Sequence, residues 1–238
     1  MRPLIQREFN GRTARIAHST RGDGDLSPST VAADDLSQRR QRAVALPWCV
    51  LRQVHSDRAI PVAPAYATME RLVGDALVTN ETNLVLAVHS GDCVPVGFIT
   101  DSATVAAAHA GWKGLEAGVL ESTVRCLREF DGAASITAAV GPHIRASHYE
   151  FGPAALDRLA RRFGPGVIGA TNVGRPALDL TAAIAVELDR LGVDIVEWSG
   201  DCTARDADLY WSHRERQERG RIALVAWIES ADRTEGSR

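Results

Sequence analysis

Residues 84–109, LVLAVHSGDCVPVGFITDSATVAAAH, decide the fold of this chain. The segment holds three apolar runs, at 84–89, 94–100 and 103–109, and short polar stretches separate them. Apolar runs of this length, bounded by turn-forming residues, are typical of buried strands joined by short turns. The middle of the chain is therefore predicted to be a series of β-strands.

The same pattern extends in both directions from this segment. Further strands are predicted on each side of it, at 48–55, 58–63, 75–79, 135–140, 193–198 and 222–228. Helices are predicted at 34–46, 114–130, 153–163 and 180–191. Because the strands come in runs and the helices do not strictly alternate with them, the order predicts the α+β class and not a doubly wound parallel sheet.

The composition is that of one folded unit. The chain has 238 residues, of which 45% are apolar and 24% charged, so it is long enough to bury a full core. No repeat, linker or low-complexity segment indicates a second domain, so one domain is expected over 1–238, with a flexible tail at 230–238. The turn-rich residues 20–30 are expected to form an exposed loop.

Charge and hydropathy exclude several classes of function. The net charge of −3 and a pI of about 6.2 give no electrostatic reason to bind nucleic acid or an anionic membrane. The N-terminus has no apolar signal peptide core, and no later apolar stretch approaches the length of a membrane span, so a soluble cytoplasmic protein is expected. The four cysteines show no pairing pattern, so we expect reduced thiols.

Three side chains that can bind a metal stand at the ends of apolar runs: His55, Cys93 and His109. Two imidazoles and a thiolate suit Zn²⁺, and three protein ligands leave the fourth tetrahedral position open for water or substrate. A structural zinc site would have a fourth Cys or His, usually in a short Cys-x-x-Cys or similar pair, and the chain has no such pair. The pattern therefore predicts a catalytic zinc centre, with copper as the less favoured metal.

Two other interpretations of these residues stay open. Taken singly, each is also typical of a buried polar residue at the end of a strand. Without a metal, Cys93 and one of the histidines would form a dyad in which imidazole lowers the pKa of the thiol and the thiolate attacks an acyl centre. The shared context of the three residues favours the metal site.

Two loops carry candidates for substrate contacts. In the first, Gly residues let the backbone approach a ligand, Lys113 and the start of a helix favour an anion such as phosphate, and Trp112 can stack on a base. In the second, Arg145 can pair with phosphate, Glu150 can act as a general base, and His143 can line the site. No role is assigned to the charged stretch that contains Cys202 and His213-Arg214.

Six short strings closely resemble the bacterial laccase-domain family, also called the polyphenol oxidase or peptidoglycan editing factor family. They are QVHS (53–56), GDALVT (74–79), GDCVPV (91–96), HAGWKG (109–114), GPHI (141–144) and YEFG (149–152). The resemblance runs from about residue 10 to residue 228. It implies a four-layer α/β/β/α sandwich with mixed sheets and one zinc held by His55, Cys93 and His109. This chain departs from the family pattern at His143, where Cys is common, and at Lys113, where Arg is common.

The resemblance also implies an activity. Family members are described as purine nucleoside phosphorylases that cleave adenosine, inosine, guanosine or 5′-methylthioadenosine with phosphate, with adenosine deamination as a side activity. The alternative is a zinc or cysteine hydrolase that edits peptidoglycan precursors. A copper polyphenol oxidase is the least favoured class, because a four-copper laccase uses about ten histidines, many in His-x-His pairs, and this chain has seven histidines and no such pair.

Overall fold

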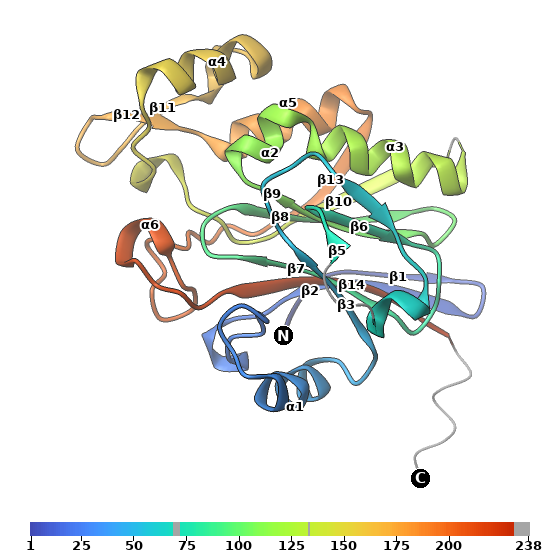
Figure 1. Cartoon of the computed structure of the whole chain (residues 1–238). Helices are drawn as coiled ribbons and strands as arrows, with labels where there is room; N and C mark the ends of the chain where they lie inside the picture. The colour runs from blue at the N-terminus through green and yellow to red at the C-terminus, as the bar shows by residue number, and fades with distance from the viewer. Residues whose placement is uncertain (69–71, 133, 231–238) are drawn as a thin grey trace.

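The computed structural model describes residues 1–68, 72–132 and 134–230. In this part of the chain, two six-stranded mixed sheets face each other and helices cover both outer faces (Figure 1). The first sheet has the order β1-β2-β14-β7-β3-β5, and the second has the order β13-β10-β8-β9-β6-β4. The α+β class and the four-layer α/β/β/α arrangement are thus confirmed.

The strands of the first sheet are β1 (Arg2–Phe9), β2 (Arg12–His18), β3 (Trp48–Arg52), β5 (Leu72–Val73), β7 (Val85–Ser90) and β14 (Ile222–Ser230). Those of the second are β4 (Ala59–Pro61), β6 (Ala76–Thr79), β8 (Val94–Thr100), β9 (Val105–Ala110), β10 (Ile136–Val140) and β13 (Val193–Trp198). A small separate hairpin is formed by β11 (Ile168–Ala170) and β12 (Pro176–Leu178).

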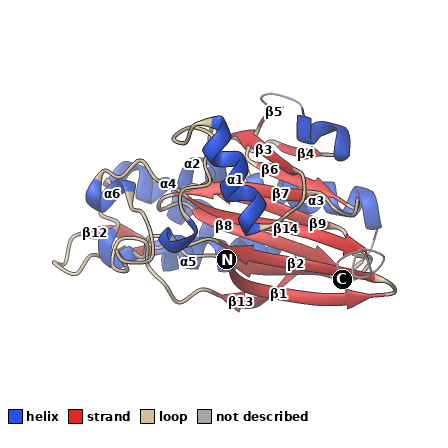
Figure 2. Cartoon of the chain, turned by 90° about the horizontal axis from the view of Figure 1, so that it is seen from below, coloured by secondary structure: helices blue, strands red, loops and turns tan. Residues whose placement is uncertain are grey.

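The α-helices are α1 (Ala33–Ala43), α2 (Trp112–Ala117), α3 (Val119–Asp131), α4 (Pro153–Phe163), α5 (Leu180–Arg190) and α6 (His213–Arg216). Helices α2, α3 and α5 pack on the outer face of the second sheet, and α1 crosses the outer face of the first (Figures 1 and 2). Helix α4 and the β11–β12 hairpin extend beyond the edge of this layer (Figure 1).

Alternation of side chains along the central strands explains the layers. In β9, Ala106 and Ala108 face the helical layer, whereas Val105 and Ala107 face the other sheet. In β7, Leu86 and Val88 face the second sheet, whereas Val85 and Ala87 face α1. Strands buried on both faces read as continuous apolar runs, which is why residues 84–109 predict the centre of the sandwich.

Most predicted elements are confirmed, and three differences have clear physical causes. The β1–β2 hairpin was not predicted, because its strands are largely polar, although its turn contains the dipeptide Asn10-Gly11 that favours a hairpin. The helix predicted at 114–130 is broken at Gly118, whose φ of 102° ends α2 and starts α3. The loop at 20–30 is not fully exposed, because Leu26 is buried under the first sheet.

Three further expectations concern the C-terminal tail, membrane-spanning helices and the cysteines. The tail expected at 230–238 falls outside the described residues from 231 onward. In the described ranges, no helix is long and apolar enough to cross a membrane. All four cysteines are free.

Two buried histidines predict how stability depends on pH. Burial lowers the pKa of His89 and of His143 to about 3, whereas an exposed histidine titrates near 6.5. Between these values the unfolded chain binds more protons than the native one, so stability falls as pH falls. Each histidine is expected to reduce the free energy of unfolding by about 1.4 kcal/mol per pH unit below its unfolded pKa.

Urea unfolding at pH 7 and pH 5 measures this effect. His143→Asn and His89→Gln keep a donor for the carbonyl that each ring contacts, Gly141 and Leu26 respectively, without a group that titrates in this range. Each variant should therefore show a shallower pH dependence than the wild type. Acid also releases a bound metal, but it does so in the wild type and in both variants alike. The same pH dependence of the free energy of unfolding in all three proteins would therefore contradict the prediction.

Candidate metal centre

The three predicted ligands meet at one end of the sandwich, where the chain crosses between the sheets. His55 lies on the crossing from β3 to β4, and Cys93 lies on the crossing from β7 to β8. His109 is near the end of β9 and pairs with Pro95 at the start of β8. This end of the sheets is on the left in Figure 1, near α6.

Their geometry is that of an open three-ligand site. One ligand atom from each of His55, Cys93 and His109 lies within 4.8 Å of the other two. The Cys93 Sγ is 3.7 Å from the His55 Nε2, and the two imidazole rings meet edge to face with centroids 4.9 Å apart. His109 is buried, Cys93 is half-buried and His55 is exposed, so the site opens on the His55 side.

A buried carboxylate, Asp75, holds two of the ligands in place. Its oxygens accept the backbone N–H groups of Val54 (3.2 Å), His55 (3.0 Å) and Ser56 (2.7 Å), and also the Ser56 hydroxyl (2.8 Å). Three consecutive amides around one carboxylate form an anion-binding nest. The nest stabilises His55 in the left-handed region, at a φ of 61°.

Asp75 also orients His109. Its Oδ1 lies 3.0 Å from the His109 Nδ1, which leaves Nε2 free to bind a metal. A carboxylate behind a ligand histidine fixes the tautomer and the ring orientation. Burial raises the pKa of Asp75, but hydrogen bonds from His109 and Ser56 lower it to about 2, so the carboxylate is charged at neutral pH.

Glycine is required at position 111. A Cβ there would lie 2.7 Å from the His55 Cδ2 and 2.9 Å from the Cys93 Sγ, so any side chain would push two ligands apart. Gln53 completes the support, because its amide exchanges two hydrogen bonds of 2.8 Å with the backbone of His89 and so extends the pairing of β3 with β7 up to the site.

Charge within the site favours a thiolate at Cys93. Burial raises the pKa of the thiol, but the His109 and His55 imidazoles lower it to about 6. Burial lowers the pKa of His109, but Cys93 and Asp75 raise it to about 9. A thiolate at neutral pH is the form that binds a metal, and it is also the form that acts as a nucleophile.

Asp92, the residue before Cys93, ties the C-terminal loop to the site. Its carboxylate accepts the Thr203 hydroxyl and the Arg214 backbone N–H, each at 2.6 Å. Its φ of 123° is strained for a residue with a side chain, and such strain persists only where surrounding contacts enforce it. These contacts fix the turn that presents Cys93.

The predicted base-stacking residue Trp112 belongs to a row of aromatic rings. Trp112 meets Phe151 edge to face, and Phe151 contacts Tyr149, with centroids 5.4 Å apart in each pair. Lys113 is exposed, and its Nζ lies 5.5 Å from the Trp112 ring. Arg214 links this row to the metal centre, because its guanidinium lies 4.5 Å from the centroid of the Tyr149 ring and its backbone N–H donates to Asp92 beside Cys93.

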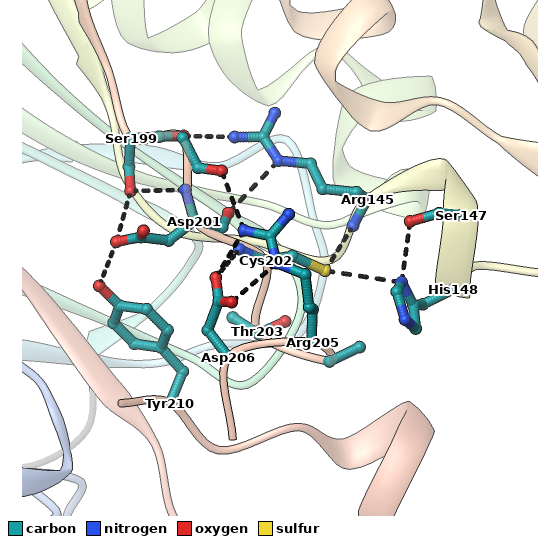
Figure 3. Close-up of polar contacts among 12 residues, drawn as sticks. Arg145, Ser147, His148, Ser199, Asp201, Cys202, Thr203, Arg205, Asp206 and Tyr210 are labelled. Carbon is teal, nitrogen blue, oxygen red and sulfur yellow. Dashed lines mark hydrogen bonds and ion pairs between the residues drawn. The ribbon is translucent and has the colours of Figure 1, made fainter. Parts of the chain in front are cut away.

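Arg145 is hydrogen-bonded to carbonyls of the neighbouring chain segment (Figure 3), and His143 is fully buried. The Arg145 guanidinium donates to the Thr181 hydroxyl at 2.6 Å and to the carbonyls of Asp201 (3.3 Å) and Ser199. All three guanidinium nitrogens of Arg145 therefore already donate to groups of the protein. His143 has no exposed surface, and its nitrogens contact the Gly141 carbonyl (2.8 Å) and the Thr181 hydroxyl (3.0 Å), so it supports the loop from within.

Glu150, predicted as a general base, lies at the surface. Its carboxylate is 2.9 Å from the Arg175 Nη1, and about half of its side chain is exposed. No metal-ligating group in the described residues includes it. Its backbone carbonyl accepts a hydrogen bond of 2.7 Å from the Arg214 Nη1.

The residues that support the candidate ligands were not predicted from the sequence. Asp75 stands in the string GDALVT, directly before a strand, and a carboxylate in that position is a signal for a residue that orients a histidine. Asp92 is adjacent to a predicted ligand, but nothing in the sequence indicates that it binds Thr203 and Arg214, which are more than 100 residues away.

A family model described as multi-copper polyphenol oxidoreductase laccase matches residues 21–229, most of the chain. The chain belongs to this family. A Mycobacterium bovis relative of the laccase family, named purine nucleoside phosphorylase, is 35% identical over 210 residues, which cover 85% of this chain and 81% of the relative. A Streptomyces coelicolor relative of the same name is 39% identical over 158 residues, 65% of this chain and 64% of the relative.

Solved structures show the same fold. The Bacillus licheniformis protein YfiH has a TM-score of 0.80 and 26% identity, with 94% of this chain and 95% of that chain covered. A Neisseria meningitidis protein has a TM-score of 0.78 and 26% identity, with 95% and 99% covered. The four-layer sandwich is therefore the fold of this laccase-like family.

The residues present fit a single metal ion. Two imidazole nitrogens and a thiolate converge, glycine keeps the space between them free, and Asp75 prepares the His109 tautomer. This donor set suits zinc, since oxygen ligands are absent and the thiolate is soft. In the described ranges it is the only group of three such residues.

Proposed function

We propose that this chain is a zinc-dependent purine nucleoside phosphorylase acting on adenosine, inosine, guanosine or 5′-methylthioadenosine. The observation that carries the proposal is the open His55-Cys93-His109 centre beside a row of aromatic rings. The names of the relatives support the substrate class. In the reaction, an oxygen of HPO₄²⁻ bonds to C1′ of the pentose as the bond from C1′ to the purine nitrogen breaks, and the phosphate proton ends on the purine.

The ligand residues would hold the metal at the open end of the site. Bound zinc supplies a Lewis acid that stabilises developing negative charge, and the same property supports adenosine deamination as a second activity. Asp75 keeps the His109 ring in the binding tautomer, and exposed His55 stands where a substrate enters. The aromatic row beginning at Trp112 offers apolar surface to a purine and excludes water from one side.

Phosphate dependence tests the proposed reaction. Zinc-loaded protein should release free base from a panel of the four nucleosides only when phosphate is present, and pentose 1-phosphate should form in equal amount. Base release at the same rate without phosphate would contradict the proposal.

The metal content gives a separate prediction. Purified protein should carry about one zinc per chain, because the described residues provide one three-ligand set. Elemental analysis measures this directly. A mole or more of tightly bound copper with no zinc would contradict the zinc assignment and favour the redox chemistry in the name of the family model.

Lys113 and Arg145 are the two cationic residues predicted to bind phosphate, and Lys113 is the exposed one. Lys113→Ala should raise the apparent KM for phosphate roughly threefold to tenfold and change the KM for nucleoside less, because it removes a charged contact to one substrate. Steady-state kinetics with each substrate varied in turn measures the split. Equal changes in both KM values would place Lys113 outside the phosphate site.

A hydrolase that edits peptidoglycan precursors is the second candidate. The observation that favours it is the lowered pKa of Cys93 beside His109, which suits a thiolate nucleophile. Such an enzyme would need no phosphate and would release an amino acid from a precursor peptide, so the phosphate test separates the two candidates.

A further inference from the structure

Arg214 lies next to the metal centre, although no pattern in the sequence assigns it a role. Its backbone N–H donates to the carboxylate of Asp92, and Asp92 directly precedes the metal ligand Cys93. Its guanidinium lies 4.5 Å from the centroid of the Tyr149 ring, and its Nη1 donates to the Glu150 carbonyl at 2.7 Å. Arg214 is therefore anchored at both its backbone and its side chain, at the edge of the metal centre.

The guanidinium keeps donors for a ligand. Arg214 is exposed, and within the described ranges its Nε and Nη2 have no hydrogen-bond partner. A guanidinium held over an aromatic ring, with N–H groups free on Nε and Nη2, can make a bidentate contact with a phosphate or carboxylate. The contrast with Arg145 is direct, because the guanidinium of Arg145 is occupied by the carbonyls of Asp201 and Ser199 and by Thr181.

A second donor stands beside it. Tyr149 is 7% exposed, yet its hydroxyl has no partner among the residues that the structure describes. The hydroxyl is not one of the fully buried polar atoms that lack a partner, so it reaches the surface and can donate to a ligand there. Arg214 connects Tyr149 to the metal centre, because its guanidinium lies over the Tyr149 ring while its backbone N–H donates to Asp92, the residue before Cys93.

We propose that Arg214 and the Tyr149 hydroxyl form the binding site for the phosphate co-substrate. The inference rests on the proposed phosphorylase function and names the residues that would hold its second substrate. The Arg214 guanidinium supplies charge and a two-pronged contact, Tyr149 supplies a neutral hydrogen bond, and Asp92 fixes Arg214 through the backbone. The site places inorganic phosphate between the row of rings and the metal centre.

The test is the KM for phosphate of zinc-loaded Arg214→Gln, with Arg214→Lys and Tyr149→Phe. The Asp92 contact uses the backbone of Arg214, so all three variants should keep zinc at the wild-type level. Arg214→Gln should raise the KM for phosphate at least about tenfold and the KM for nucleoside less than about twofold. Arg214→Lys should recover part of the loss, since it keeps the charge without the fork, and Tyr149→Phe should raise the KM for phosphate about threefold.

Arg12→Gln is the matched control. Arg12 is an exposed arginine at the β1–β2 turn. It pairs with Ser230 at one end of β14, whereas Ser90, close to Cys93, pairs with Ile222 at the other end, so Arg12 lies far from the metal centre. A KM for phosphate in Arg214→Gln within twofold of the control would overturn the site, even if the wild type is a phosphorylase.

Failure of the proposed function would be visible separately. If the wild type releases no base with phosphate, calorimetric titration with inorganic phosphate alone decides the inference. Binding to the wild type that is lost in Arg214→Gln and kept in Arg12→Gln would support the site. Equal binding in all three proteins, or none in the wild type, would overturn it.

Discussion

Cys93→Ser is expected to lose both its zinc and more than about 99% of its nucleoside-cleaving activity. A hydroxyl is a much poorer zinc ligand than a thiolate, and the described site has no spare member to replace it. His55→Ala and His109→Ala should behave in the same way. Elemental analysis of each purified variant, together with its rate of base release, measures both losses.

The Cys–His dyad predicts a different pairing of results. A covalent nucleophile would make Cys93→Ser inactive while chelation of the wild type leaves activity unchanged. The metal account predicts instead that zinc protects Cys93 from alkylation and that chelation exposes it. Burial raises the pKa of Cys49 and of Cys126 to about 11, and the fourth cysteine, Cys202, is only 1% exposed, so at neutral pH alkylation of the native protein should report on the Cys93 thiolate.

Cys126→Ala is the control for removing a thiol. It lies on α3, is buried in the core and contributes to no metal-ligating group in the described residues. This variant should keep its zinc and its activity. Loss of zinc in Cys126→Ala as large as in Cys93→Ser would show that zinc content reports general instability and not ligand removal.

Asp75→Asn is expected to weaken zinc binding by about 10-fold to 100-fold and to lower the free energy of unfolding by about 3 kcal/mol. The substitution replaces one acceptor oxygen by an NH₂ group, which cannot accept the N–H groups that surround the carboxylate. It also removes the charge that orients His109. Competition with a chelator and urea unfolding measure the two effects.

Ser56→Ala is the graded control for Asp75. It removes one hydroxyl donor to the carboxylate and leaves the backbone donors and the His109 contact intact, so about 1 kcal/mol of stability should be lost with little change in zinc affinity. Wild-type zinc affinity in Asp75→Asn would show that the ligands are held by the strands alone.

Much of the fold could be predicted from the sequence because the central strands are buried on both faces. Continuous apolar runs such as 84–89 and 94–100 indicate strands without reference to any partner. The N-terminal hairpin carries several charged residues, and its position depends on β2 pairing with β14, more than 200 residues away, while the edge strand β1 pairs with β2 alone. Local sequence carries little of that information.

The candidate site also combines features that local sequence indicates with features that depend on contacts between distant segments. The meeting of His55, Cys93 and His109 at one place could be predicted, because their residue types and their positions after apolar runs are local features. The site's supports depend on contacts across the fold, such as Asp92 with Thr203 or Tyr149 with Arg214, so they could not be found from spacing. The reverse holds for Arg145, whose residue type suggested phosphate and whose contacts place it within the fold.

The most direct test of the account is the rate of purine release from inosine by apoprotein and by the same protein after one equivalent of zinc is added, with and without phosphate. We predict no release without zinc, recovery at one zinc per chain, and no release without phosphate even when zinc is present. Full activity after verified removal of all metal would contradict the role of His55, Cys93 and His109 as the catalytic metal centre.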